Sequence, residues 1–246
     1  MTVTSVNRPW FGASVCGPAH RRAGVPKQDA WKGFRGRFGS LVVVADGLGS
    51  RAYGREGALA ACRAAYRAVR ELGAPNLPQP ESLFRLLERT WLDEIAPRDP
   101  GECSTTVLFS LIHPSGATLL GQIGDGLIVV GGDTTADVLG PEDNTFGNET
   151  SGLGMPHLAP VWHSRLLPSL PASSRILLAT DGVSDDLHPR ALSGFIAELD
   201  RDFGPFPPGE RHRRLCAALR DWPTAGHYDD KTLALHWRGQ DGVTCL

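Results

Sequence analysis

Runs of apolar residues that end in Asp-Gly constrain this chain more than any other feature. The pattern ends the apolar stretches 41–47 and 176–182 and recurs in 122–126, and Asp229-Asp230 stands just before the apolar stretch 232–237. Such stretches predict strands that are buried on both faces. A carboxylate at the end of a buried strand is held rigidly and still faces solvent. Several of them at one sheet edge would form a cluster of hard oxygen ligands for divalent cations.

A single Asp-Gly pair is first of all a turn or helix-cap signal, so no one pair establishes a site. The combination is stronger, because two of the pairs end strongly apolar stretches and each precedes a predicted helix or loop. Two carboxylate-held ions about 3.5–4 Å apart lower the pKa of a shared water and neutralise charge on a phosphoryl group. The sequence therefore indicates metal-assisted hydrolysis of phosphate esters.

Composition excludes several other classes of protein. The 246 residues are 41% hydrophobic and 21% charged, with a formal net charge of −2, as in an ordinary globular protein. Nothing in that balance favours nucleic acid or an anionic membrane as a partner. No stretch is long enough to span a bilayer, and residues 1–10 lack the apolar core of a secretion signal. Five cysteines without a C-x-x-C pair favour a reducing, cytoplasmic location.

The order of predicted elements favours an α+β fold. Strands are expected at 38–45, 105–112, 117–123, 127–130, 175–180 and 232–237, and helices at 53–72, from 80 onward, at 190–199 and at 208–222. Strands and helices occur in separate runs rather than in alternating βαβ units. Residues 131–160 are expected to form a weak strand and a long surface loop. No domain boundary is visible, so we expect a single domain over residues 1–246.

Residues 47–52 also match G-x-G-x-x-A, the outline of a dinucleotide-binding turn. Asp46 would repel a pyrophosphate there, and the Pro-rich segment 73–80 leaves no second strand after the helix. No acidic residue is placed to hold a ribose. A nucleotide-binding oxidoreductase is therefore a weak alternative. The sequence has no G-x-S-x-G, P-loop or H-E-x-x-H motif.

A short basic segment, His20-Arg21-Arg22, precedes Asp29. Guanidinium groups form bidentate pairs with phosphate, so these three residues are candidate phosphate ligands, although a solvated basic turn explains each of them equally well. His113 and His236 are expected to have structural roles.

Six short phrases, in order, resemble the motifs of the type 2C metal-dependent serine/threonine protein phosphatases, and especially their compact bacterial members. They occupy residues 24–30, 44–49, 103–106, 123–126, 177–185 and 229–232, and the similarity extends from about residue 11 to 237. The resemblance implies a four-layer α-β-β-α sandwich, with two antiparallel sheets packed face to face and helix pairs outside.

The resemblance also implies roles for individual residues. Two Mg²⁺ or Mn²⁺ ions would be held by the catalytic aspartates Asp46, Asp181 and Asp229 and by the Gly47 carbonyl. Asp125 would contact a third, weaker ion, and Asp29 would act through water. A water that bridges the ions would be the nucleophile. The substrate would be a phosphoserine or phosphothreonine protein in a signalling pathway with its own Ser/Thr kinase.

The chain departs from the family pattern at several positions. Gln28 stands where many members have Glu, Leu48 where some have a histidine proposed as general acid, and Gly24 where an arginine is usual. Asp230 replaces an asparagine and Gly126 a serine, and residues 143–154 stand where the family keeps a mobile flap. The three intact core aspartates favour a working phosphatase. The alternative is a regulatory or binding module that keeps the fold and turns over poorly.

Overall fold

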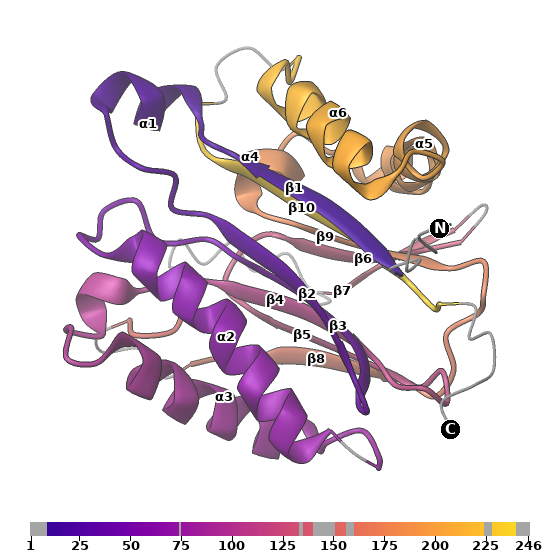
Figure 1. Cartoon of the computed structure of the whole chain (residues 1–246), viewed down its shortest axis with the longest axis horizontal. Coiled ribbons are helices and arrows are strands. Elements are labelled where there is room, and N and C mark those ends of the chain that lie inside the picture. Colours follow the sequence, from indigo (N-terminus) through magenta and orange to yellow (C-terminus); the bar gives the residue numbers. More distant parts are fainter. Residues whose placement is uncertain are drawn as a thin grey trace, which may run out of the picture.

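The computed structural model describes residues 9–73, 75–132, 135–139, 151–155, 160–223 and 228–239 (Figure 1). Within these residues the strands form two five-stranded antiparallel sheets. Sheet A has the order β1 (Trp10–Val15), β10 (Lys231–Trp237), β9 (Arg175–Ala179), β6 (Leu127–Gly131) and β7 (Ala136–Leu139). Sheet B has the order β2 (Ala30–Gly36), β3 (Gly39–Ala45), β4 (Val107–Ile112), β5 (Thr118–Ile123) and β8 (His163–Leu167).

Helices cover the outer face of each sheet (Figure 1). The long helices α2 (Gly54–Leu72) and α3 (Pro80–Ile95) lie on sheet B, and α5 (Leu192–Phe203) and α6 (Pro208–Arg220) lie on sheet A. Two shorter helices, α1 (Pro18–Ala23) and α4 (Asp181–Ser184), begin directly after strands, and 3₁₀ turns occupy Gly101–Cys103 and Pro189–Ala191. This arrangement confirms the predicted α+β fold with helices outside two antiparallel sheets. No helix in the described ranges combines the length and apolar character needed to cross a membrane.

Three apolar layers explain why most residues of the central strands are hydrophobic. One layer lies between the sheets, and one lies under each helix pair. All residues of β4 and β5 are buried, because these strands face the opposite sheet on one side and α2 and α3 on the other. The inner layer also includes a hydrogen-bonded polar group. The ring of His236 on sheet A is bound by Ser40 at 2.8 Å and Ser110 at 2.7 Å on sheet B, as expected for a structural histidine.

The predicted strands and helices occur with small shifts in their ends, but three N-terminal elements were not predicted. These are β1, α1 and β2. The weak strand expected after residue 131 is β7, and β8 lies just after the expected loop 131–160, where no strand was predicted. Residues 143–150 of the expected flap lie outside the described residues. After α2 the chain continues into α3 and not into a parallel strand, so the dinucleotide-binding alternative is wrong.

Candidate metal and phosphate site

The predicted acidic motifs lie at one end of the sandwich. Antiparallel pairing brings the ends of β3 and β9 beside the beginnings of β2, β4, β6 and β10. The aligned pairs include Ala45 with Ala30, and Ala179 with both Leu233 and Leu127. The residues that follow or precede these pairs are the predicted ligands. We call this end of the sandwich the acidic edge.

Asp46 leaves the end of β3 with its backbone fixed by two threonines. Its N–H donates to Thr106 Oγ1 at 3.1 Å, and its carbonyl accepts from Thr105 Oγ1 at 2.7 Å and from the Thr106 N–H at 2.8 Å. The Ser-Thr-Thr phrase therefore positions the carboxylate rather than supplying a ligand. These bonds hold Asp46 rigidly, as a metal ligand requires.

Gly47 is required by a close backbone crossing. A Cβ at this position would lie 2.2 Å from the carbonyl oxygen of Gly54, the first residue of α2. Only glycine lets the loop after Asp46 pass so close to the helix. The Asp-Gly pair at this site thus has a packing reason as well as the proposed ligand role of the Gly47 carbonyl.

Asp29 lies immediately before β2 and is only 3% exposed. Its Oδ2 accepts a hydrogen bond from Thr180 Oγ1 at 2.9 Å, while Oδ1 has no hydrogen-bond partner among the described residues. A buried carboxylate oxygen without a hydrogen-bond partner lowers the stability of the folded protein. A cation, or a water molecule bound to one, would supply the missing partner.

Asp181 and Asp229 approach the acidic edge from sheet A. Asp181 begins α4, and its Oδ1 accepts from the Gly182 N–H at 2.6 Å. Asp229 precedes β10, and its Oδ1 accepts from the Asp230 N–H at 2.7 Å. A Cβ on Gly182 would lie 1.9 Å from the Asp230 carbonyl oxygen, which explains why the second Asp-Gly pair also needs glycine.

The electrostatics of the four acids show a chain of neighbouring carboxyl groups. Burial raises the pKa of Asp46 well above its usual range, and the nearby charges of Asp29 and Asp181 raise it further. Burial likewise raises the pKa of Asp29 to about 6. Burial raises the pKa of Asp181, and the negative charge of Asp229 adds to the effect. Asp29 contacts Asp46, Asp46 contacts Asp181, and the charge of Asp229 acts on Asp181.

This donor set fits a divalent cation. Its groups are hard oxygen ligands, which suit Mg²⁺ and Mn²⁺ and do not select soft metals. Like charges held together in a buried place favour a bound cation, and the groups that act on the Asp46 carboxyl include the carboxyl groups of Asp29 and Asp181. Asp46, Asp181 and Asp229 would hold the ions, with Asp29 nearby.

Asp125 is the aspartate that was predicted to contact a third ion. It lies in the turn between β5 and β6, where Gly124 and Gly126 both have positive φ angles, of 97° and 93°. The turn is at the acidic edge, and Asp125 is exposed. Gly126 fits its position because a left-handed backbone favours glycine. The role of Asp125 at a third ion stays a prediction.

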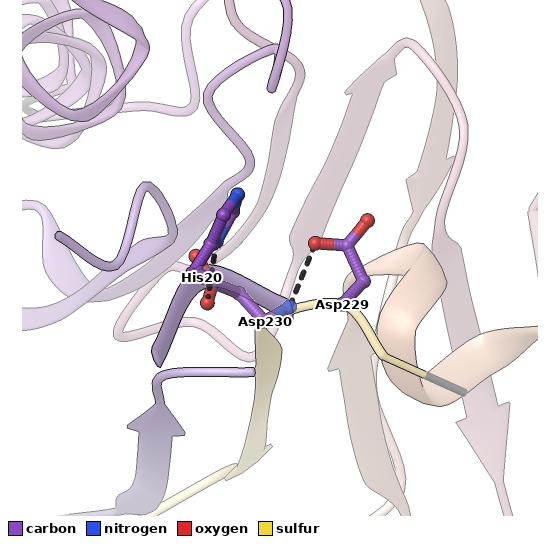
Figure 2. A group of neighbouring side chains, drawn as sticks. All are labelled: His20, Asp229 and Asp230. Carbon is purple, nitrogen blue, oxygen red and sulfur yellow. Dashed lines mark hydrogen bonds and ion pairs between the residues drawn. The ribbon is translucent and has the colours of Figure 1, made fainter. Parts of the chain in front are cut away.

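His20, Asp229 and Asp230 form a compact group, shown in Figure 2. One ligand atom of each lies within 4.8 Å of the others, and His20 Nδ1 is 3.0 Å from Asp230 Oδ1. Asp230 is 2% exposed and accepts the N–H groups of Gly17 at 2.7 Å and Gln28 at 2.6 Å, one on each oxygen. Asp230 therefore anchors the N-terminal segment to the acidic edge.

The three candidate phosphate ligands point to different places. His20 lies at Asp229 and Asp230. Arg22 donates from Nε to the Pro18 carbonyl at 3.2 Å, and its guanidinium lies 4.8 Å from the centre of the Tyr228 ring. Arg21 lines a separate pocket beside α6. Only His20 of the three is brought to the acids.

Lys27 is a site residue that the sequence did not single out. Its Nζ donates to the Asp29 carbonyl and, at 2.6 Å, to Ser14 Oγ. Burial lowers the pKa of Lys27, and the charges of Asp29 and Asp230 partly offset this effect. Its place two residues before Asp29, in the first family-like phrase, was the signal that could have identified it.

Comparisons with known proteins agree with this architecture. The sequence model of protein phosphatase 2C matches residues 16–220. No curated protein matches the chain by sequence. The fold is similar to that of the PPM Ser-Thr phosphatase MsPP from Mycobacterium smegmatis in complex with cacodylate, with a TM-score of 0.64 and 21% identity over 94% of this chain and 98% of that one.

Two further structures were solved with metal ions. The catalytic domain of the serine threonine protein phosphatase PstP, in complex with 2 manganese ions, has a TM-score of 0.59 and 20% identity over 93% of this chain and 96% of that one. RsbX in complex with magnesium has a TM-score of 0.56 and 14% identity over 94% of both chains. These likenesses establish the fold, and the family match covers most of the sequence. The chain therefore belongs to the protein phosphatase 2C family.

Proposed function

We propose that the chain is a working Mg²⁺- or Mn²⁺-dependent phosphatase that hydrolyses phosphoserine and phosphothreonine in a protein substrate. The observation that carries the proposal is the chain of four carboxyl groups at the acidic edge, Asp29, Asp46, Asp181 and Asp229; burial and neighbouring charges raise the pKa values of the first three. Such perturbation at a cluster of acids is characteristic of functional sites.

In this proposal Asp46, Asp181 and Asp229, with the Gly47 carbonyl, hold two divalent ions, and Asp29 acts through water. When bound, the ions supply activation of water and neutralisation of charge on the phosphoryl oxygens. The protein keeps the ligands in place through Thr105 and Thr106 at Asp46 and through Thr180 at Asp29. Asp125 would contact a third ion.

We assign His20 as the phosphate contact of the trio His20, Arg21 and Arg22. His20 is the member that lies beside Asp229, and its Nδ1 is 3.0 Å from Asp230 Oδ1. Protonated imidazole donates to phosphate oxygens as a guanidinium does. His20 would thus take the place of the arginine that Gly24 lacks, while Leu48 has no proton to give to a leaving group.

The proposal treats residues 1–246 as one phosphatase domain in the cytoplasm, acting on a protein phosphorylated by a cognate Ser/Thr kinase. The acids come from both sheets, since Asp46 follows β3 of sheet B and Asp181 follows β9 of sheet A. Neither half of the sandwich could form the site alone. No described feature calls for nucleic acid or a membrane.

The test is turnover of p-nitrophenyl phosphate with Mn²⁺ or Mg²⁺, before and after EDTA, by wild type and Asp46→Asn. Asp202→Asn is the matched control, because Asp202 is a half-exposed carboxylate on α5 that pairs with Arg201. We expect EDTA to abolish turnover, and Asp46→Asn to reduce it by more than about 100-fold, the upper range for second-shell changes. Wild-type turnover that is absent, despite metal binding detected by calorimetry, would favour the regulatory module instead.

A further inference from the structure

A small pocket of about 150 Å³ is lined by residues at the start of α1 and the end of α6. Its cationic lining consists of Arg21 from α1, Arg220 from α6 and Lys231 from β10. The rings of Trp222 and Tyr228 form further walls, and none of the described residues that line the pocket is acidic. The lining therefore suits an anionic group.

Two carboxylates close to this pocket accept hydrogen bonds from uncharged N–H groups. Asp186 accepts a hydrogen bond from the Trp222 indole N–H at 2.7 Å. Asp230 accepts backbone N–H groups on both oxygens. Arg21 and Arg220 are exposed, so their guanidinium groups are accessible to an incoming anion. A bound anion would make charge-assisted hydrogen bonds to them, which are the stronger class.

The pocket adjoins the acidic edge. Tyr228 and Lys231, two of its lining residues, flank Asp229 and Asp230 in the sequence, and Lys231 Nζ donates to the Asp229 carbonyl at 3.2 Å. One residue of extended chain spans about 3.3 Å, so the pocket wall lies within about two residue lengths of Asp229. A substrate chain whose phosphorylated residue is at the acids would bring a side chain one or two positions away to this pocket.

We propose that this pocket binds an acidic side chain of the substrate, one or two residues from the phosphoserine or phosphothreonine. The pocket volume equals that of about five water molecules at roughly 30 Å³ each, enough for a carboxylate or a second phosphoryl group. The proposal rests on the proposed function, because it names the sequence around the phosphorylated residue. It makes Arg21 and Arg220 specificity residues that recognise the substrate away from the reacting phosphate.

The test compares matched phosphothreonine peptides that carry Glu, Gln, Lys or phosphoserine at positions one and two on either side. The variants are Arg220→Gln, Arg21→Gln and the charge reversal Arg220→Glu. Arg213→Gln is the matched control, because Arg213 is exposed on the same helix and does not line the pocket. Turnover of p-nitrophenyl phosphate, which has no neighbouring residue, reports the chemistry alone.

We expect wild type to favour the Glu peptide over the Gln peptide in kcat/KM by about threefold to tenfold, from the upper part of the range for an exposed ion pair to somewhat above it. Arg220→Gln should remove most of that preference and leave p-nitrophenyl phosphate turnover unchanged, while Arg220→Glu should favour Lys-flanked peptides. The phosphoserine arm separates a preference for doubly phosphorylated substrates from one for Glu. Equal turnover of Glu and Gln peptides by wild type, or an unchanged preference in Arg220→Gln, would overturn the proposal.

Failure of the proposed function would look different. Wild type would then show no metal-dependent turnover of any substrate. The pocket would in that case be tested by binding: the Kd for phosphonate versions of the same peptides would be measured by fluorescence anisotropy. A Glu preference in Kd that Arg220→Gln removes would still support the pocket as an anion site. Equal affinities for the Glu and Gln peptides would refute it.

Discussion

His236 makes the stability of this protein depend on pH in a way that can be isolated from every other group. The ring is fully buried between the two sheets, and both nitrogens are hydrogen-bonded to serine hydroxyls of sheet B, at Ser40 and Ser110. Burial lowers its pKa from 6.5 to about 3. The folded protein therefore keeps this imidazole neutral at a pH at which the unfolded chain binds a proton.

The sign and size of the pH effect on the free energy of unfolding follow from proton linkage. Between about pH 6.5 and pH 3 the unfolded state binds more protons at this position, so the contribution is lost as pH falls through that window. At pH 5, which is about 1.5 units below the unfolded pKa, the loss is about 2 kcal/mol at 1.36 kcal/mol per unit. Below pH 3 it would reach about 5 kcal/mol, an amount comparable to the whole stability of a small domain.

The assay is urea denaturation in EDTA at pH 7.5 and pH 5.0, on wild type and His236→Gln. Glutamine can still donate to one serine and accept from the other but does not titrate in this range. Raised pKa values at the acidic edge act in the opposite direction, because those acids bind protons more readily in the folded state, but they are common to both proteins and cancel. Wild type should lose about 2 kcal/mol more than His236→Gln on acidification.

A control variant separates titration from hydrogen bonding. Ser40→Ala removes one partner and keeps the imidazole, so it should be less stable at both pH values and retain the wild-type slope. Equal pH slopes for wild type and His236→Gln would refute the reasoning, since the buried ring would then not be what binds the extra proton on unfolding.

Three further predictions concern the acidic edge. Mn²⁺ or Mg²⁺ at 100 times its Kd should stabilise the folded wild type at pH 7 by about 2.7 kcal/mol, measured as a higher Tm. The ion should not stabilise Asp181→Asn. An equal rise in Tm for both proteins would contradict the proposed set of metal ligands. Gly47→Ala should cost about 3 kcal/mol in urea denaturation, because its Cβ would lie 2.2 Å from the Gly54 oxygen, and wild-type stability would show that the loop relaxes freely. Asp230→Asn should cost about 1.5–3 kcal/mol by weakening two charge-assisted hydrogen bonds, and an unchanged denaturation midpoint would argue against Asp230 as an anchor.

The strands that could be predicted from the sequence differ in residue composition from those that could not. β3, β4 and β9 consist mostly of apolar residues, with Ser40 in β3 and Ser110 in β4 as exceptions, so the sequence alone indicates that they are buried on both faces. β1 and β2 contain glycines at close approaches: a Cβ on Gly12 would lie 2.7 Å from the Leu233 carbonyl oxygen, and one on Gly33 would lie 2.1 Å from the Trp10 indole nitrogen. In the sequence, these glycines argue against a strand. Only the structure shows that each one makes room for a neighbouring strand or ring.

The same distinction applies to the candidate site. The aspartates could be predicted because each follows or precedes a recognisable strand, and antiparallel pairing then brings them to one edge. The division among His20, Arg21 and Arg22 could not, because their helix was not predicted. Successive residues on a helix point about 100° apart, so three consecutive side chains on α1 face three directions and only one can face the acids.

Asp230 shows how a departure from the family pattern acquires a physical reason only in the folded chain. The family asparagine would offer one acceptor oxygen, whereas a carboxylate offers two. Here the two oxygens accept the N–H groups of Gly17 and Gln28, which come from the segments before α1 and before β2. The extra negative charge strengthens both bonds, and His20 Nδ1 lies 3.0 Å from Asp230 Oδ1. The substitution therefore fastens the N-terminal segment, with its phosphate-binding candidate, to the strand that carries Asp229.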